Sequence, residues 1–558
     1  MNQHQRPWLD AYPPGVPAEI DPDQYQSLNQ LIDESMQNFR DKACYSYMGK
    51  EFSFAQIDAQ SAAFAAYLQG LGLKKGDRVA VMMPNVVQYP VAVIGVLRAG
   101  LVLVNVNPLY TARELEHQLN DSGATAIVII ENFAQTLQQC LTKTPVKHIV
   151  LTSMGDSLGL LKGALVNYVV RNVKKLVPAF DLPGAVRFNE ALRIGQGRTL
   201  APVAVQSSDI AVLQYTGGTT GVSKGAVLTH RNIIANILQS AVWNEPVMGL
   251  IPKEQQPTLV CALPLYHIFA FTVNMMLGLR NGSKNILLPN PRDLDSVLKE
   301  LAKHTFHSFP AVNTLFNGLL HHPGFNTVDW SNLKMSLGGG MAVQGAVAKL
   351  WLEKTGSPIC EGYGLSETSP CATCNPVTNR EFNGTIGLPL PSTEIKCLDD
   401  EGNEVPLGTP GEIAIKGPQV MQGYWQRPDE TAKVMTADGF FRSGDIGVMN
   451  EQGYVRIVDR KKDMVLVSGF NVFPNEVEDV IAMMPGVLEC AVVGVPDEKT
   501  GEAIKLVIVK REPGLSEEAV RDYAKHNLTN YKRPKHVEFR DSLPKTPVGK
   551  ILRRELRD

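Results

Sequence analysis

The chain has 558 residues, of which 44% are apolar and 20% are charged, and its formal net charge at pH 7 is −2. This length exceeds what a single hydrophobic core supports, so we expect at least two domains. The near-neutral charge argues against a general nucleic-acid-binding protein, and eight cysteines are too few for a disulfide scaffold. The sequence shows neither a signal peptide nor a run of about eighteen apolar residues, so we expect a cytoplasmic protein.

The N-terminal part of the chain alternates between strand and helix patterns. The first helix is amphipathic, with Leu28, Leu31, Ile32 and Phe39 at helical spacing. The following segments predict strands at 78–83, 101–106 and 124–130 and helices at 86–98 and 111–119. Apolar strands that alternate with helices are typical of parallel sheets covered on both faces, and therefore of an α/β body.

Residues 157–180 are apolar and basic and contain no acid. Lys162, Arg171, Lys174 and Lys175 lie among many apolar side chains. A basic amphipathic segment of this kind can lie on an anionic membrane surface, so one hypothesis is that it brings the protein to the inner face of the inner membrane. The alternative is a helix that packs on the body and presents a solvated basic face.

A loop rich in glycine and hydroxyl groups lies between two apolar runs. It extends from Tyr215 to Gly225, and Lys224 is its single charged residue. Glycines let backbone N–H groups turn toward an anion, and hydroxyls and a lysine add donors, so we expect a phosphate-binding loop between two buried strands. Lys224 is not followed by Ser or Thr at the start of a helix, which disfavours a P-loop kinase or ATPase.

Three later stretches have the features of a ligand pocket. An apolar strand at 259–263 leads into a cluster with His267 and Phe269, although a single histidine there is also compatible with a satisfied core residue. A strand at 335–337 ends in glycines 338–340, where a ligand can approach the backbone. Residues 361–368 combine an aromatic ring, hydroxyls and a carboxylate, which suits adenine stacking and a magnesium ion.

The pattern changes in the C-terminal third. Short alternating strands begin at Ile413, and a hairpin at 448–458 precedes a charged run at 459–463 that marks a boundary. Beyond the boundary, Pro474 is placed to start a helix. Strands at 489–495 and 504–510 and a helix from Ser516 complete a small α+β unit.

These stretches together resemble the adenylate-forming superfamily of acyl-CoA synthetases, luciferases and peptide-synthetase adenylation domains. The stretches that carry the resemblance are 215–225, 263–269, 361–368, 443–445, 459–463 and 544–550. They occur in the order of that superfamily and span nearly the whole chain. More narrowly, 438–462 is similar to the fatty acyl-CoA synthetase signature, and the chain as a whole is similar to bacterial enzymes that act on long-chain fatty acids.

The resemblance implies an α/β fold with a large N-terminal body that includes a small β-rich subdomain, and a small, mobile α+β cap. The implied boundaries are 1–459 for the body, 460–463 for the hinge and 464–558 for the cap. The implied reaction has two steps. A fatty acid carboxylate attacks the α-phosphorus of ATP to give acyl-AMP and pyrophosphate, and the thiol of CoA then displaces AMP.

The resemblance also assigns roles to individual residues. The residues expected to bind ATP or AMP are Tyr215, Thr216, Gly217, Gly218, Thr219, Thr220, Gly221, Lys224, Glu361, Gly362, Tyr363, Ser366, Asp445 and Arg460. Glu367 and Thr219 are expected to bind Mg²⁺. Those expected to line the acyl channel are His267, Phe269, Gly338, Gly339 and Gly340.

The cap carries the remaining expected roles. Lys550 would bridge the substrate carboxylate and the α-phosphate, so that the expected catalytic residues are Lys550, Lys224 and Glu367. Lys462 would be the hinge, and Ser468 and Gly469 would contact CoA. A homodimer and peripheral membrane contact are further expectations. The alternatives are a medium-chain or other acid–CoA ligase, an acyl-AMP ligase that loads a carrier protein, or a non-enzymatic membrane adaptor, which would not need the phosphate-binding residues.

Overall fold

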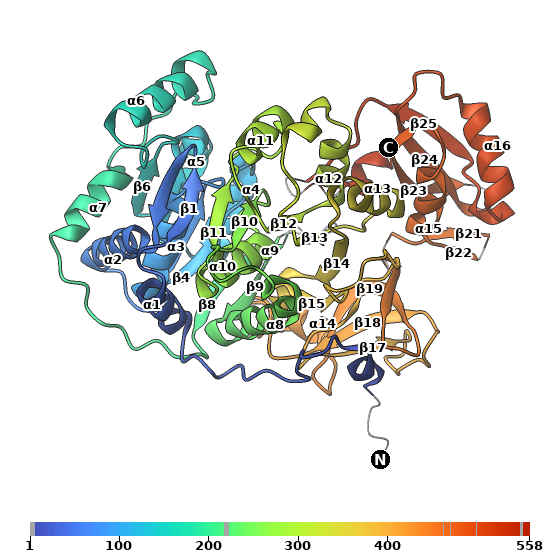
Figure 1. Ribbon diagram of the computed structural model, residues 1–558, viewed down its shortest axis with the longest axis horizontal. Coiled ribbons are helices and arrows are strands. Elements are labelled where there is room, and N and C mark those ends of the chain that lie inside the picture. The colour runs from blue at the N-terminus through green and yellow to red at the C-terminus, as the bar shows by residue number, and fades with distance from the viewer. Residues whose placement is uncertain are drawn as a thin grey trace.

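The computed structural model describes residues 6–557 except 217–222, 461–462, 469, 498, 547–548 and 550, and only the backbone of Arg460 and Asn471. Two large sheets and their covering helices form the body, and a smaller domain at the C-terminus lies at one end of the long axis (Figure 1). The predicted α/β body and α+β C-terminal domain are therefore confirmed. Among the described residues, no helix is long and apolar enough to cross a membrane.

The first sheet of the body has seven strands in the order β7-β6-β5-β3-β4-β8-β9. All neighbouring pairs are parallel except β8 and β9. The strands are β3 (Arg78–Met82), β4 (Val102–Asn105), β5 (Ala126–Ile130), β6 (His148–Thr152), β7 (Val186–Arg187), β8 (Ile210–Thr216) and β9 (Lys224–Thr229). The strands predicted from the sequence at 78–83, 101–106 and 124–130 thus lie next to one another. The glycine-rich loop connects β8 with the antiparallel edge strand β9.

The second sheet has nine strands in the order β16-β15-β14-β13-β12-β10-β11-β1-β2. They are β1 (Ala43–Tyr47), β2 (Lys50–Ser53), β10 (Thr258–Cys261), β11 (Lys284–Leu287), β12 (Ser308–Ala311), β13 (Met335–Gly338), β14 (Ile359–Gly364), β15 (Cys371–Cys374) and β16 (Leu388–Pro389). From β1 to β14 through β11, β10, β12 and β13 the pairs are parallel, so the strand ends that carry the predicted pocket stretches share one edge. Ligands of α/β sheets bind at this carboxyl edge.

Helices cover both sheets of the body. Their bounds are α1 (Leu28–Asn38), α2 (Phe54–Gly70), α3 (Gln88–Arg98), α4 (Ala112–Ser122), α5 (Ala134–Cys140), α6 (Leu160–Tyr168), α7 (Phe188–Gln196), α8 (His230–Met248), α9 (Ile268–Ala270), α10 (Leu277–Arg280), α11 (Leu294–Leu301), α12 (Asn313–Leu320) and α13 (Gly345–Thr355). Local chemistry sets several helix starts, since Ser53, Thr111 and Thr229 each form a capping box. One continuous hydrophobic core includes residues of both sheets and of α8.

Two smaller units complete the molecule. The β-rich subdomain is an antiparallel sheet of β17 (Glu394–Leu398), β18 (Gly411–Lys416), β19 (Phe441–Met449) and β20 (Val455–Arg460), with α14 (Pro428–Val434). The C-terminal domain contains β21 (Val465–Val467), β22 (Phe470–Val472), α15 (Pro474–Ala482), β23 (Val487–Asp497), β24 (Gly501–Lys510), α16 (Glu517–Asn527) and β25 (His536–Arg540). It has hydrophobic clusters of its own, as expected for an independent folding unit.

Candidate active site

The strands that flank the glycine-rich loop hold its two ends close together. Thr216 pairs with Lys224 across β8 and β9, and the Ser223 hydroxyl donates to the carbonyl of Thr216 at 2.7 Å. The loop residues Gly217, Gly218, Thr219, Thr220 and Gly221 lie outside the described residues. The predicted setting of this loop, between two buried strands, is confirmed by the structure.

The side chain of Tyr215, which we expected to bind the nucleotide, lies in the hydrophobic core. It is buried beside β4 and β5, and its phenol donates to Asp121 Oδ2 at 2.7 Å. Burial, and then the bond to Asp121, raise the pKa of this phenol well above its ordinary value. The side chain of Tyr215 therefore fastens β8 to α4.

Lys224 and Glu367 are brought together by a residue that the sequence did not indicate, Tyr424. The ammonium of Lys224 lies 5.1 Å from the centre of the Tyr424 ring, and the Tyr424 phenol donates to Glu367 Oε1 at 2.8 Å. Burial and the charge of Glu367 raise the pKa of the phenol, which keeps it a donor. Next to the glycine-rich loop, one aromatic residue thus has a lysine over its ring and a carboxylate at its hydroxyl.

Lys224 also forms an ion pair with Glu430 of α14. The hydrogen bonds from Lys224 and then Lys433 lower the pKa of Glu430 to about 2, so this carboxylate is ionised at neutral pH. An incoming phosphate group would compete with Glu430 for the ammonium of Lys224. No signal in the sequence links these two residues, which are 206 positions apart.

Tyr363 and Asp445 meet at the boundary between the body and the β-rich subdomain. The Tyr363 phenol, at the end of β14, donates to Asp445 Oδ2 at 2.6 Å. Asp445 is buried in β19, directly opposite Arg460 of β20, whose side chain lies outside the described part. Strand β19 is irregular just before Asp445, where Gly444 has a φ of +75°, a conformation that favours glycine. An aromatic ring and a carboxylate at bonding distance can together contact the base and the sugar of a nucleotide.

Glu361 precedes Gly362 and Tyr363 on β14 and is buried. Its side-chain Oε1 accepts from the backbone N–H of Val343 at 3.1 Å. Its backbone carbonyl accepts from the backbone N–H of Asn375 at 2.9 Å. Burial, and then the charge of Asp479 on α15 of the C-terminal domain, raise the pKa of Glu361 to about 8. Ser366 and Glu367 follow in a short 3₁₀-helix, Ser366–Thr368.

The glycine stretch and the cluster around His267 form one wall. An added Cβ at Gly339 would lie 2.9 Å from the ring of Phe269, and one at Gly338 would lie 2.5 Å from Val343. These two glycines therefore allow other side chains of the protein to approach the backbone, whereas Gly340 has a φ of +80°. His267 caps α9 and accepts through Nδ1 from the N–H of Phe269 at 3.3 Å.

The C-terminal domain reaches this wall through Gly549. An added Cβ at Gly549 would lie 2.8 Å from Thr314 Oγ1 and 3.2 Å from Val312, and Val312 in turn faces Gly340. Lys550 itself lies outside the described residues, as do Lys462 and Gly469. Ser468 lies in the turn between β21 and β22, where its N–H donates to the carbonyl of Thr500 at 2.8 Å.

The junction between the two domains is centred on Arg553. Its guanidinium lies 2.7 Å from Glu478 Oε2 and 3.6 Å from both Asp459 and Asp463. Asp459, which is fully buried, also accepts from the N–H of Asn475 at the start of α15. No signal in the sequence indicated this cluster, because the acidic partners of Arg553 lie 75 or more positions away.

The donors at this site fit a magnesium ion that arrives with a polyphosphate. No group of three or more His, Cys, Asp or Glu residues that could hold a metal occurs in the described part of the chain. Mg²⁺ usually keeps several waters and binds through one or two carboxylates together with substrate phosphates. Glu367, buried next to Lys224 and the glycine-rich loop, is such a carboxylate.

Comparisons with known proteins agree with this geometry. The family model for AMP-binding enzymes matches residues 32–425, and that for their C-terminal domain matches 476–550. Proteins named long-chain-fatty-acid–CoA ligase from Escherichia coli and Haemophilus influenzae are 54% and 50% identical, and each alignment covers 99% of this chain and 98% of the relative. The structure of ATP-bound MatB from Rhodopseudomonas palustris is similar, with a TM-score of 0.81, 29% identity, and coverage of 95% of this chain and 98% of MatB.

Proposed function

The chain belongs to the family of AMP-binding enzymes, and we propose that it is a long-chain-fatty-acid–CoA ligase. ATP and a fatty acid are converted to acyl-AMP and pyrophosphate, and CoA then displaces AMP to give the acyl-CoA thioester. Full-length relatives with that name, at 50–54% identity, support this activity. ATP and CoA are co-substrates of the reaction, and the alternative of a P-loop kinase or ATPase is set aside.

The body contributes the residues that bind the nucleotide. We assign the β- and γ-phosphates to residues 216–221 and Lys224, the α-phosphate to Ser366, the base to Tyr363, and the ribose to Asp445 and Arg460. The attack of a carboxylate on a polyanion needs neutralisation of negative charge, and fixed backbone donors, hydroxyls and Lys224 provide it at little reorganisation cost. Mg²⁺, held by Glu367 and the phosphates with Thr219 nearby, would add positive charge there.

The single observation that best supports this function is the contact of Gly549 with Val312 and Thr314, beside Gly340. It brings the neighbour of Lys550 in the sequence to the wall where the acyl group is expected, formed by His267, Phe269 and glycines 338–340. We therefore propose that Lys550 bridges the carboxylate and the α-phosphate during adenylation. CoA must reach the same part of the site that Lys550 occupies during adenylation. The cap (464–558) must therefore rotate about 460–463, with Lys462 as the hinge, so that Ser468 and Gly469 come near the pantetheine.

Lys550→Ala tests this assignment. Pyrophosphate release should fall by at least about a hundredfold, the range typical of electrostatic and acid–base contributions, while thioester formation from supplied acyl-AMP continues. Lys545→Ala is a matched control, since Lys545 belongs to the same loop but is paired with Glu489 at 2.6 Å. An equal loss in both half-reactions would contradict the role of Lys550.

Two further points of the function are proposals of the same kind. Assay of a panel of fatty acids for CoA-dependent AMP formation tests the long-chain preference, and comparison of CoA with a holo-carrier protein tests the acceptor. We also propose a cytoplasmic location with peripheral contact to the inner membrane, and a homodimer. Sedimentation velocity checks the oligomeric state.

A further inference from the structure

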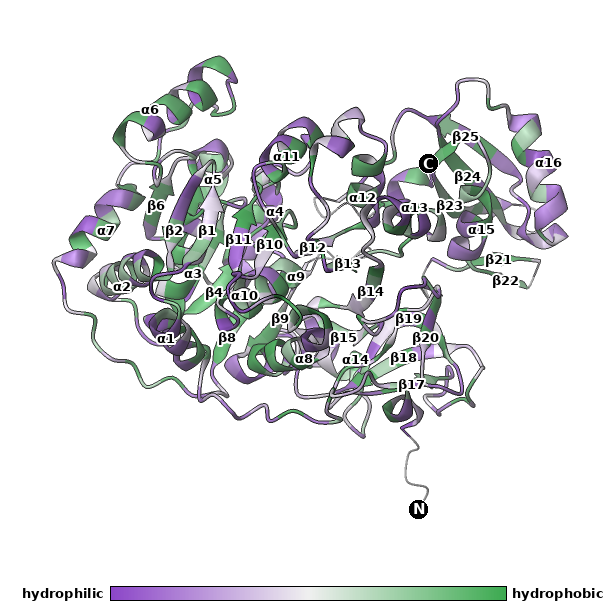
Figure 2. Cartoon of the chain, viewed as in Figure 1, coloured by the Kyte–Doolittle hydropathy of each residue, from purple (hydrophilic) through white to green (hydrophobic). Residues whose placement is uncertain are grey.

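An apolar surface lies on α6 and the turn that follows it. Six of the twelve exposed large apolar side chains in the described part of the chain lie between 160 and 176, and Leu160 and Leu161 are 92% and 90% exposed. We call these residues the α6 face: Leu160, Leu161, Leu165, Tyr168, Val173 and Leu176. Soluble proteins seldom expose so many neighbouring apolar groups unless the surface binds something. In Figure 2, α6 stands out from the body at the upper left and carries hydrophobic as well as hydrophilic colouring.

The spacing explains why these residues face outward. Leu161, Leu165 and Tyr168 are separated by four and three positions, so they form one stripe on the helix. The opposite side carries Gly163 and Val170, which are buried. The expected alternative, a helix that packs on the body and presents a solvated basic face, does not account for this exposed apolar stripe.

Close packing holds α6 against the body. An added Cβ at Gly163 would lie 2.4 Å from the carbonyl of Gly155, so the two backbones are in direct contact. Asn167 accepts from the N–H of Gly155 at 2.7 Å and donates to Asp156 Oδ1 at 3.1 Å. The helix is thus fixed by its inner side, and the α6 face is presented in a defined orientation.

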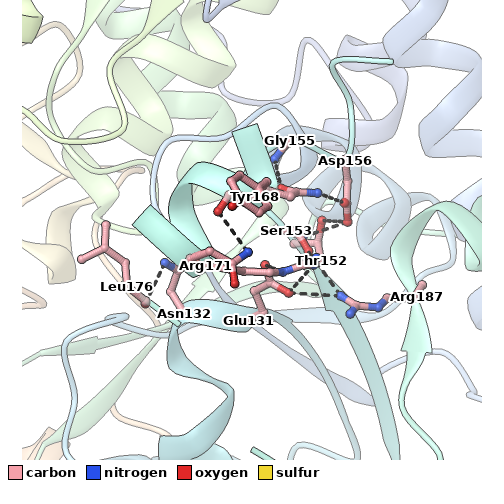
Figure 3. A network of polar contacts seen from close by, with 12 residues as sticks. Glu131, Asn132, Thr152, Ser153, Gly155, Asp156, Tyr168, Arg171, Leu176 and Arg187 are labelled. Atoms are coloured by element: carbon pink, nitrogen blue, oxygen red, sulfur yellow. Dashed lines mark hydrogen bonds and ion pairs between the residues drawn. The ribbon is translucent and has the colours of Figure 1, made fainter. Parts of the chain in front are cut away.

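A buried carboxylate fastens the turn after α6 (Figure 3). Arg171, in the π-helical turn Val169–Val173, donates to both oxygens of Glu131 at 2.9 and 2.7 Å, and Arg187 adds a longer contact to the same carboxylate. The Glu131 side chain is 1% exposed, so the loss of its partners would leave a buried charge. Arg171 therefore anchors the segment to the body and is not a contact for an external partner.

The positive charges beside the α6 face favour a lipid surface as its binding partner. Lys162, Lys174 and Lys175 are exposed beside the α6 face, and residues 157–180 contain no acid. Lys162 donates to the carbonyl of Met48. The hydrogen bonds from Ser296, and then the charge of Lys174, lower the pKa of Asp293. Leucines flanked by lysines match the boundary between acyl chains and anionic headgroups, whereas two copies of this chain that met symmetrically through this face would bring their lysines together.

We infer that the α6 face docks the protein on an anionic lipid bilayer, with the leucines among the acyl chains and the lysines at the headgroups. The inference gives a structural element to the peripheral association proposed above. The α6 face lies at the opposite end of the long axis from the C-terminal domain (Figure 1), so a docked molecule leaves that domain free to move. A fatty acid dissolved in the bilayer would then be close to the enzyme that activates it.

Co-sedimentation of the full-length protein with phospholipid vesicles tests the inference without any substrate. Wild-type protein should pellet with vesicles of phosphatidylcholine and phosphatidylglycerol. The variant Leu160→Ser/Leu161→Ser/Leu165→Ser should reduce the partition coefficient by at least about tenfold, because three apolar side chains leave the bilayer. Lys174→Gln/Lys175→Gln should reduce it by about fivefold per lysine, and only on vesicles that contain phosphatidylglycerol.

Leu250→Ser is the matched control, because Leu250 is 75% exposed at the end of α8, outside the α6 face, and its loss should leave pelleting unchanged. All variants should keep the wild-type melting temperature, since the changed residues are exposed.

Equal pelleting of wild type and the triple-serine variant would overturn the inference. So would a wild-type dimer that the triple variant dissociates without any vesicle binding, which would make a second copy the occupant. CoA thioester formation with a short, water-soluble acid should be the same in all variants, so a failure of the proposed ligase activity is detected separately.

Discussion

Gly549→Ala should slow adenylation and spare thioester formation from supplied acyl-AMP. Gly549 has a φ of +81°, where an L-residue costs about 1 kcal/mol. The new Cβ would also lie 2.8 Å from Thr314 Oγ1 and 3.2 Å from Val312, and the first of these contacts is closer than side chains tolerate. Only the arrangement in which the C-terminal domain touches α12 suffers this contact. If the contact and strain together cost about 1.4 kcal/mol, the adenylation rate falls roughly tenfold.

The assay compares pyrophosphate release from ATP and fatty acid with thioester formation from acyl-AMP and CoA. Gly514→Ala is the control, because Gly514 belongs to the same domain and an added Cβ there meets nothing within 4 Å. Thr314→Ala removes the nearest clashing atom, so in the Gly549→Ala background it should restore part of the adenylation rate in a double-mutant cycle. Equal loss in both half-reactions, or no rescue by Thr314→Ala, would refute the contact as the cause.

Three other changes test the site and the domain junction. Glu430→Gln should free Lys224 and lower the KM for ATP about two- to fivefold, as expected for a surface ion pair. Lys433→Gln should leave the KM unchanged. An unchanged KM of Glu430→Gln in steady-state kinetics would count against competition between Glu430 and phosphate for Lys224. Arg553→Met should lower stability to urea by about 3 kcal/mol because it leaves buried acids unpaired, and Arg554→Met, at an exposed position, should not. Burial holds a proton on folded Glu361 up to about pH 8, while the unfolded chain loses it near pH 4.5, so the free energy of unfolding should fall as pH rises between these values. In Glu361→Gln this decline, measured by urea unfolding at several pH values, should be smaller by an amount on the order of a few kcal/mol. Identical pH profiles for the two proteins would show that Glu361 is ionised in the fold.

Most of the fold could be predicted because its elements have local signals. The strands at 78–82 and 126–130 are apolar runs bounded by turn residues, and Thr111, Ser516 and Pro474 mark helix starts that the structure has. Most predicted boundaries differ from the observed ones by one to three residues, and for the strands backbone bonding to neighbouring strands decides the end. The order of strands within each sheet had no such signal, because it depends on pairings between distant segments.

The site was predicted less completely because its geometry comes from pairs of distant residues. The family pattern indicated Lys224 and Glu367, but Tyr424, which joins them, lies 57 positions from Glu367 in a stretch without a motif. The same holds for Asp121, the partner of Tyr215, and for the acids around Arg553. A motif identifies which residues can do the chemistry, and the tertiary structure decides which of their neighbours hold them in place.

These pairings suggest how the site changes when a nucleotide binds. Lys224 is held by Glu430, and Tyr363 by Asp445, so these two residues expected to contact ATP already have protein partners. Such bonds keep the side chains in fixed positions, which lowers the reorganisation cost of binding. Phosphate oxygens can replace Glu430 as the partner of Lys224, and ribose hydroxyls can share Asp445 with Tyr363. The nucleotide would then exchange partners at residues that are already in position, and the C-terminal domain would add the last cation through the loop that follows Thr546.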